Sequence, residues 1–161
     1  GTTSCRVSPI VREVHDITTL ADLQAFANAW VETLQPGDLI TLSGELGAGK
    51  TTFVKAIVTA MGGDPDGVQS PTFSLLHHYP CSTPVIHIDA YRLEGVDDAM
   101  RTGIPDVLNE ESPTSITFVE WPEKVPQLWG PVSAHILFQE VASTETQKKQ
   151  RTLTIESSFP S

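Results

Sequence analysis

The sequence predicts an α/β fold, a three-layer sandwich with a mainly parallel central sheet between helices and antiparallel edge strands. Short apolar, strand-like runs alternate with amphipathic helical segments between residues 20 and 120, a pattern typical of parallel sheets with helical crossovers. Two further strand-like runs close the chain, joined by a polar segment, and they predict the antiparallel edge. With 161 residues, 39% of them hydrophobic, residues 1–161 are expected to form a single domain.

The first third of the chain predicts one edge strand and one helix. Residues 1–9 are expected to be a flexible lead and residues 11–17 a short edge strand. Thr19 and Asp22 have the spacing of a helix-opening capping box. The apolar face of the helix that follows, which Pro36-Gly37 should end, comprises Leu20, Leu23, Ala27, Trp30, Val31 and Leu34. Trp30 on this face is expected to pack in the core rather than to bind a ligand.

A glycine-rich motif follows a short strand-like run, residues 38–43, and precedes a helical repeat of apolar residues. It satisfies the phosphate-loop pattern G-x-x-x-x-G-K-[ST] without a gap. Its residues are Gly44, Glu45, Leu46, Gly47, Ala48, Gly49, Lys50, Thr51 and Thr52. Because the motif lies between a strand and a helix, where this chemistry requires it, the fold is expected to be P-loop NTPase-like.

Each part of the motif has a physical reason. The glycines allow backbone conformations in which N–H groups close around an anion, and the first turn of the next helix adds free N–H groups and a positive dipole end. Lys50 is expected to reach the β- and γ-phosphates, and the Thr51 hydroxyl to ligate Mg²⁺. An unoccupied glycine-rich turn is the alternative, but such a turn has no need of lysine followed by threonine.

The remaining segments supply the other strands and helices. Residues 62–67 are expected to be loop, and polar residues 143–150 the connection of a terminal hairpin. A helix is expected over 94–101, ended by Gly103, then a short turn at 105–108 and a loop at 109–114. The expected strands are residues 75–79, 85–89, 116–119, 133–141 and 151–155.

Two acidic residues end strand-like runs, Asp89 and Glu120. The carboxyl ends of parallel strands gather near the phosphate loop, so one acid is expected to contact Mg²⁺ and the other to position the attacking water. Spacing alone does not assign these roles, and either acid has the alternative of a helix cap or a surface position. His87 shares a strand face with Asp89, but no third ligand has suitable spacing, so we interpret it as structural.

The segment Ser70-Pro71-Thr72-Phe73 lies where other nucleotide hydrolases carry a switch that senses the γ-phosphate. Thr72 is the candidate for its hydroxyl. A plain turn with a proline corner is the competing interpretation.

Charge and composition limit the function classes. The formal charge of −10 argues against a broad nucleic-acid surface. Cys5 and Cys81 have no metal or redox spacing and are expected to be free thiols. No apolar run approaches the roughly 18 residues of a membrane span, and the N-terminus lacks a signal-peptide pattern. We expect a soluble, cytoplasmic protein.

Taken in order, four motifs resemble the TsaE (YjeE) family over roughly residues 16–155. They are the phosphate loop, Ser70 to Phe73, the run His87-Ile88-Asp89-Ala90-Tyr91-Arg92-Leu93, and Val119-Glu120-Trp121-Pro122-Glu123. The resemblance implies a small P-loop ATPase that acts with the TsaB–TsaD complex in threonylcarbamoylation of adenosine 37 of tRNA. ATP hydrolysis to ADP and phosphate would reset that assembly, and tRNA would be contacted only indirectly.

The resemblance also implies roles for single residues. Lys50 is similar to the family's phosphate lysine, Thr51 and Glu120 to its Mg²⁺ ligands, Asp89 to a further acid needed for hydrolysis, and Thr72 to its switch threonine. Trp121 is expected close to the nucleotide, and Thr18 and Arg151 on the adenine side. Glu45 stands where the family usually has Asp, and Ala90 where it usually has Leu. Residues 94–108 match loosely.

Two other nucleotide-dependent functions fit the sequence less well. A small-molecule P-loop kinase needs several arginines on a closing lid, whereas only Arg92, Arg101 and Arg151 follow the loop. A GTP switch needs an Asn-Lys-x-Asp motif, which this sequence lacks. Adenine is therefore the favoured base, and a slow ATPase that acts through partners is the favoured function.

Overall fold

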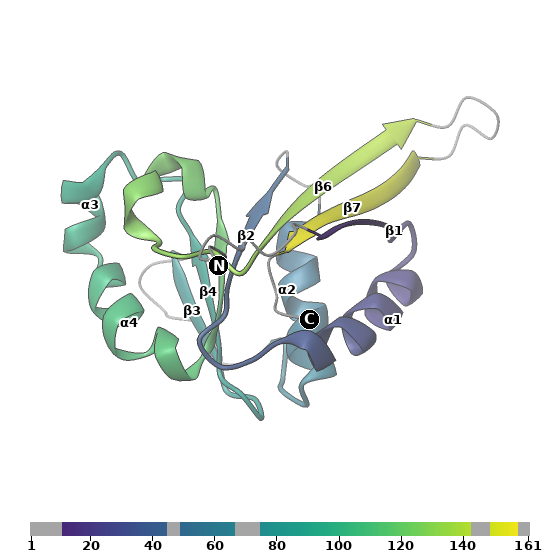
Figure 1. Cartoon of the computed structure of the whole chain (residues 1–161), viewed down its shortest axis with the longest axis horizontal. Coiled ribbons are helices and arrows are strands. Elements are labelled where there is room, and N and C mark those ends of the chain that lie inside the picture. Colours follow the sequence, from purple (N-terminus) through teal and green to yellow (C-terminus); the bar gives the residue numbers. More distant parts are fainter. Residues whose placement is uncertain (1–10, 45–48, 67–74, 143–148, 158–161) are drawn as a thin grey trace, which may run out of the picture.

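One mixed sheet organises the computed structural model, which describes residues 11–44, 49–66, 75–142 and 149–157. Within these residues seven strands follow the spatial order β1-β7-β6-β2-β5-β4-β3. Helices α1 and α2 cover one face of the sheet, and α3 and α4 cover the other (Figure 1). This arrangement confirms the α/β three-layer sandwich.

The four central strands are parallel, and the edge strands are antiparallel. Strands β6 and β7 run away from the helices as a long ribbon (Figure 1), and β1 pairs with β7. The central strands are β2 (Leu39–Ser43), β4 (Val85–Asp89), β5 (Ile116–Glu120) and β6 (Ala134–Ala142). The antiparallel strands are β1 (Val11–Asp16), β3 (Leu76–Tyr79) and β7 (Lys149–Ser157). The terminal strands thus form the expected antiparallel edge, and β3 adds another at the opposite side.

The helices begin and end at recognisable signals. The helix α1 opens with the expected capping box between Thr19 and Asp22, and α2 opens directly after Gly49. The α-helices are α1 (Leu20–Trp30), α2 (Lys50–Ala60), α3 (Val96–Arg101) and α4 (Ile104–Glu110). Short 3-10 turns are Val31–Thr33, Ser112–Thr114, Pro122–Lys124 and Pro126–Leu128.

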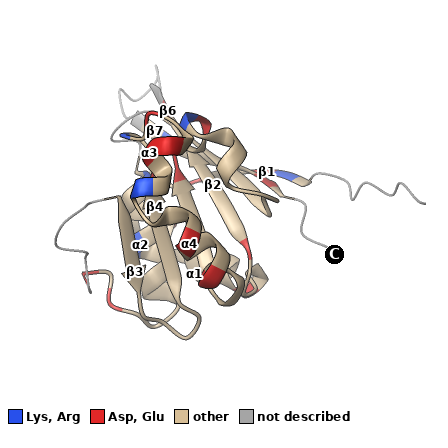
Figure 2. Ribbon diagram, turned by 90° about the vertical axis from the view of Figure 1, so that its left-hand side faces the viewer, with Lys and Arg blue, Asp and Glu red and all other residues tan. Residues whose placement is uncertain are grey.

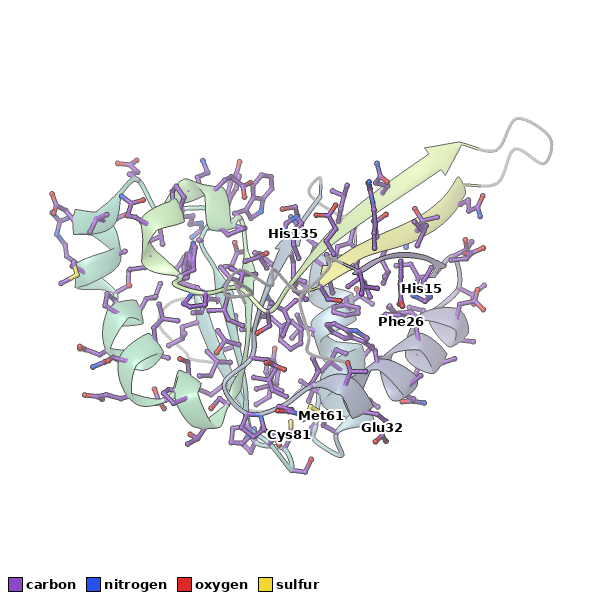
Figure 3. The ribbon with its side chains drawn as sticks, viewed as in Figure 1. His15, Phe26, Glu32, Met61, Cys81 and His135 are labelled. Carbon is purple, nitrogen blue, oxygen red and sulfur yellow. The ribbon has the colours of Figure 1, made fainter. Side chains whose placement is uncertain are left out.

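The sheet divides the core into two parts. On the α1/α2 side, Phe53 of α2 is fully buried and contacts the rings of Trp30, Phe118 and Phe138. His15 of β1 also points toward Phe26 of α1, with ring centroids 4.6 Å apart (Figure 3). This packing fixes α2 on the sheet, and with it the residues at its N-terminus. Trp30 lies in the core, as expected.

The α3/α4 side of the core is mainly apolar, with Thr41 and Thr117 as its buried polar residues on β2 and β5. Residues from β4, β5 and both helices form it: Ile86, Ile88, Val119, Ala99 and Ile104. Alternation along β4 and β5 therefore sends their other side chains, which include His87 and Glu120, to the α2 side. Burial of one face by apolar residues fixes which face receives the polar ones.

Three expected details of the helices are wrong. Residues 109–110 belong to α4 rather than to a loop, because Pro105 fits the first helical turn and the N–H of Glu111 still bonds the carbonyl of Val107. The first helix ends at Trp30, where a 3-10 turn follows with the Thr33 hydroxyl donating to the Trp30 carbonyl. Leu20 is 73% exposed, because it is the first residue of α1 and lies beyond the core.

The structure places the acidic residues and one of the two cysteines. Acidic positions occur on α1, α3 and α4 rather than in one patch (Figure 2). Cys81 is free and packs beside the core together with Met61 (Figure 3), and burial raises the pKa of its thiol. Cys5 and the expected lead lie outside the described residues. Over the described ranges, no helix is long and apolar enough to span a membrane.

Candidate functional site

The phosphate-loop frame consists of β2, Gly44 and the first turn of α2. Gly49 has φ +99°, a conformation that favours glycine, and its lack of a side chain leaves the first N–H groups of α2 without a side-chain cap. Free N–H groups at a helix N-terminus are an anion-binding arrangement. Residues 45–48 of the motif lie outside the described residues, as does the segment 70–73 with its candidate Thr72.

Lys50 is the cation of this frame, and its side chain is only 4% exposed. Its ammonium group donates to the carbonyl of Gly44 at 2.8 Å and lies 4.1 Å from the centroid of the Trp121 ring. Burial lowers the pKa of Lys50, and the nearby carboxylates of Glu120, Asp89 and Glu123 oppose that shift. Among the ion pairs of the described residues none includes Lys50, so its charge remains available to an anion.

Thr51 and Glu120 approach each other across the site. The Thr51 hydroxyl donates to Oε2 of Glu120 at 3.4 Å, and the two oxygens come from the start of α2 and the end of β5. Thr51 is exposed, whereas Glu120 is 4% exposed. Adjacent oxygen ligands of an octahedral Mg²⁺ ion lie about 3 Å apart, so this pair fits a shared magnesium ion.

His87 is the residue of the site that sequence reasoning missed. Its Nε2 lies 2.5 Å from Oε2 of Glu120, and both side chains are buried. Burial alone would raise the pKa of Glu120, but the hydrogen bond and charge of His87, the charge of Lys50 and the bond from Thr51 hold it below its ordinary value. Strand alternation predicted that His87 shares a face with Asp89. The sequence did not show that β4 pairs with β5, nor the register of that pairing, which brings His87 to Glu120.

Asp89 lies next to Glu120 because the two are direct register partners in β4 and β5. The expected gathering of strand-ending acids is therefore confirmed. Asp89 is half-buried and accepts from the backbone N–H of Tyr91 at 3.0 Å. Both acids line a cavity of about 210 Å³ together with Thr51, His77, Tyr79 and His87.

Trp121 follows Glu120 in a strained conformation. Its φ of 58° and ψ of 48° are left-handed, which costs a residue with a side chain about 1–2 kcal/mol. The conformation lays the indole over Lys50 and 5.1 Å from the Tyr91 ring, measured between ring centroids. Strain of this kind gathers at ligand clamps, and here it places an aromatic surface beside Lys50.

Thr18 and Arg151, 133 positions apart in the sequence, come together at the β1–β7 edge. The backbone N–H of Arg151 donates to the Thr18 hydroxyl at 3.2 Å, and that hydroxyl donates to Asp16. Both residues are exposed. The structure thus brings this pair of candidate nucleotide contacts together.

A metal ion here would depend on more than protein side chains. Within the described part of the chain, no group of three or more His, Cys, Asp or Glu side chains is arranged to hold a metal ion. Mg²⁺ in nucleotide sites commonly takes one or two protein ligands together with phosphate oxygens and water. Thr51 and Glu120 fit that mode, which requires the nucleotide to be present.

Fold and motif together define a P-loop-type α/β protein. Comparison with known families supports a closer assignment: residues 17–153 match the model of the family "Threonylcarbamoyl adenosine biosynthesis protein TsaE". The chain belongs to the TsaE family.

Individual relatives agree with the family assignment. The tRNA threonylcarbamoyladenosine biosynthesis protein TsaE of Rickettsia conorii is 31% identical over 119 residues, which cover 73% of this chain and 66% of that protein. The Streptomyces coelicolor protein of the same name is 42% identical over 99 residues, covering 59% and 64%. The crystal structure of Bacillus subtilis YdiB superposes with a TM-score of 0.67 at 22% identity, over 92% of this chain and 87% of that one, and supports the fold. This chain spans about two thirds of the length of the Rickettsia conorii relative.

Proposed function

We propose that this protein is a Mg²⁺-dependent ATPase that acts in the cytoplasm with the TsaB–TsaD complex in threonylcarbamoylation of tRNA. The observation that carries the proposal is the meeting of Thr51, Glu120 and Lys50 at the N-terminus of α2. Family membership supports the pathway, because the relatives are named as tRNA threonylcarbamoyladenosine biosynthesis proteins.

Binding of the triphosphate would use α2 and Lys50. The uncapped first turn of α2 offers N–H groups to phosphate oxygens. Lys50 forms no ion pair with a carboxylate among the described residues. Its ammonium group donates a hydrogen bond to an uncharged acceptor, the Gly44 carbonyl. Exchange of that carbonyl for a phosphate oxygen would replace a neutral acceptor by a charged one, which makes a stronger hydrogen bond.

The metal ligands would be Thr51 and Glu120. Bound there with the nucleotide, Mg²⁺ would neutralise charge on the phosphate oxygens. Glu120 suits this role because its lowered pKa keeps it a carboxylate despite burial. Asp89, half-buried in the same cavity, is left to accept a hydrogen bond from the attacking water.

The remaining candidate residues would surround the nucleotide. Trp121 lies against Lys50 and would border the phosphates. Thr18 and Arg151 would contact the adenine side of the nucleotide. Thr72 would act as the switch hydroxyl.

ATP hydrolysis would be coupled to the partner complex. The formal charge of −10 disfavours a direct grip on tRNA, so contact with tRNA would run through TsaB–TsaD, and ATP hydrolysis to ADP and phosphate would reset that assembly. The test is to measure ATP turnover of the purified chain with and without TsaB–TsaD and tRNA. We expect slow turnover alone and faster turnover in the complete mixture. Rapid ADP formation that requires a small-molecule acceptor and ignores those proteins would instead identify a kinase.

A further inference from the structure

A buried histidine stands beside the proposed metal ligand, and the chemistry described so far does not use it. His87 is 3% exposed, and its Nε2 lies 2.5 Å from Oε2 of Glu120. Its other ring nitrogen, Nδ1, is buried and has no hydrogen-bond partner among the described residues. The ring is therefore committed to Glu120 through one nitrogen.

The direction of this hydrogen bond follows from the carboxylate. The role proposed for Glu120 as a metal ligand uses its carboxylate form, whose oxygens only accept hydrogen bonds. Nε2 of His87 must then carry the proton and donate it.

Sheet register explains how His87 reaches Glu120. His87 is paired with Phe118 in β5, and Asp89 with Glu120, so His87 lies diagonally behind Glu120 on the same face. The diagonal neighbour on a sheet is within reach of long and aromatic side chains. Both strands are central, which makes this approach rigid.

The two hydrogen bonds that the structure gives the Glu120 carboxylate end on the same oxygen. His87 and Thr51 both donate to Oε2, and within the described residues no donor contacts Oε1. The histidine thus fixes the orientation of the carboxylate beside the Thr51 hydroxyl.

We propose that His87 is a positioning residue that holds the Glu120 carboxylate ready for the Mg²⁺–nucleotide. This inference rests on the proposed function. Outer partners that orient a ligand typically contribute 10–100-fold to metal affinity. Replacement of His87 should leave metal-free nucleotide binding unchanged, because neither Lys50 nor the N-terminus of α2 is held by His87.

The test compares His87→Leu, which keeps bulk but removes the donor, with His87→Gln, whose amide N–H reaches close to the position of Nε2. ADP affinity is measured by calorimetry without metal and across a Mg²⁺ titration, alongside the Mg²⁺ dependence of ATP turnover. His87→Leu should need about 10–100-fold more Mg²⁺ and bind ADP without metal as the wild type does. His87→Gln should recover most of the Mg²⁺ response.

A double-mutant cycle provides the second readout. If His87 acts through Glu120, adding His87→Leu to Glu120→Gln should cause no further loss of the Mg²⁺ response. Should His87→Leu fail to fold, His87→Asn replaces it, because its shorter side chain keeps a polar group but cannot place the donor at the carboxylate; it should then show the loss that His87→Gln lacks.

Three results would overturn the proposal. They are an unchanged Mg²⁺ response in His87→Leu or His87→Asn, an equal loss in His87→Gln, and additive losses in the cycle. If these occur while the wild type shows Mg²⁺-dependent nucleotide binding, only the role of His87 is wrong. A wild-type protein that binds no nucleotide at any Mg²⁺ concentration would contradict the proposed function, and this inference with it.

Discussion

The ends of β4 and β5 carry equivalent acids in different surroundings. Asp89 and Glu120 are register partners at the same sheet edge. Glu120 is buried and receives donors from His87 and Thr51, whereas Asp89 is half-buried and receives the backbone N–H of Tyr91. The difference teaches that strand position gathers the acids, while burial and hydrogen-bond partners separate a carboxylate held by two side-chain donors from one that is partly open to solvent.

The largest effect is expected from removing the cation that both acids face. Lys50→Ala should lower ATP turnover about 10²–10³-fold, the usual cost of losing one charged donor at a reacting group. Steady-state ADP release measures this change. Lys124→Ala is the matched control, because Lys124 is exposed and lies over the Tyr91 ring rather than at the loop. Equal turnover in the two variants would remove Lys50 from the site.

The β4 end should control the rate. Asp89→Asn should lower the maximal turnover by about 10²-fold, because a carboxylate that orients water contributes on this scale, and the Mg²⁺ concentration for half-maximal rate should stay unchanged. Single-turnover kinetics across a Mg²⁺ series separate the two quantities. A changed Mg²⁺ requirement with an unchanged maximal rate would reverse the assignment of the two acids.

The β5 end should control the metal. Glu120→Gln should raise the Mg²⁺ requirement about 10–100-fold, as loss of a charged ligand does in sites where the phosphates supply the remaining oxygens. ADP affinity without metal should remain near that of the wild type, which calorimetry in a chelator checks. Activity that is equal at all Mg²⁺ concentrations would exclude Glu120 as a ligand.

The smallest expected effect is on the pH dependence of stability and comes from His135, which is not at the end of β4 or β5. Burial lowers the pKa of His135, against the opposing charges of Glu156 and Glu123, and its Nδ1 lies 2.6 Å from the Thr41 hydroxyl (Figure 3). The unfolded chain then binds the proton more readily, so this part of the stability is complete above pH 6.5 and is lost as the pH falls below it.

Thermal unfolding of His135→Gln and the wild type across this pH range measures that contribution. On acidification, the melting temperature of the wild type should fall on the order of 2 °C further than that of the variant. Because other histidines are common to both proteins, the difference isolates His135. A larger loss in the variant would show the opposite sign of the pKa shift.

Sequence patterns predicted the architecture well where periodicity was strong. The seven strands, the capping box of α1 and the placement of α2 all follow from apolar spacing and turn residues. Errors occurred where local signals compete: Pro105 opens a helix that continues to Glu110, and Leu20 repeats at core spacing yet lies beyond the core.

The candidate site could be predicted only in part. The loop and both strand-ending acids were evident, because each is marked by its place in a strand or helix. The commitment of His87 to Glu120 was not, since it depends on which strands are neighbours and on their register. The left-handed backbone of Trp121 was equally hidden, because no glycine or turn motif marks the position, and only the folded structure shows its ring beside Lys50 and Tyr91. Pairing between strands carries information that no single segment contains.

The most direct test is a crystal structure of this protein with ADP and Mg²⁺. The account predicts phosphates at the N-terminus of α2 and beside Lys50, and Mg²⁺ about 2.0–2.1 Å from the Thr51 hydroxyl and from one oxygen of Glu120, with Asp89 outside the direct ligands. Mg²⁺ bound by Asp89 with Glu120 turned away, or a nucleotide bound elsewhere on the molecule, would contradict it.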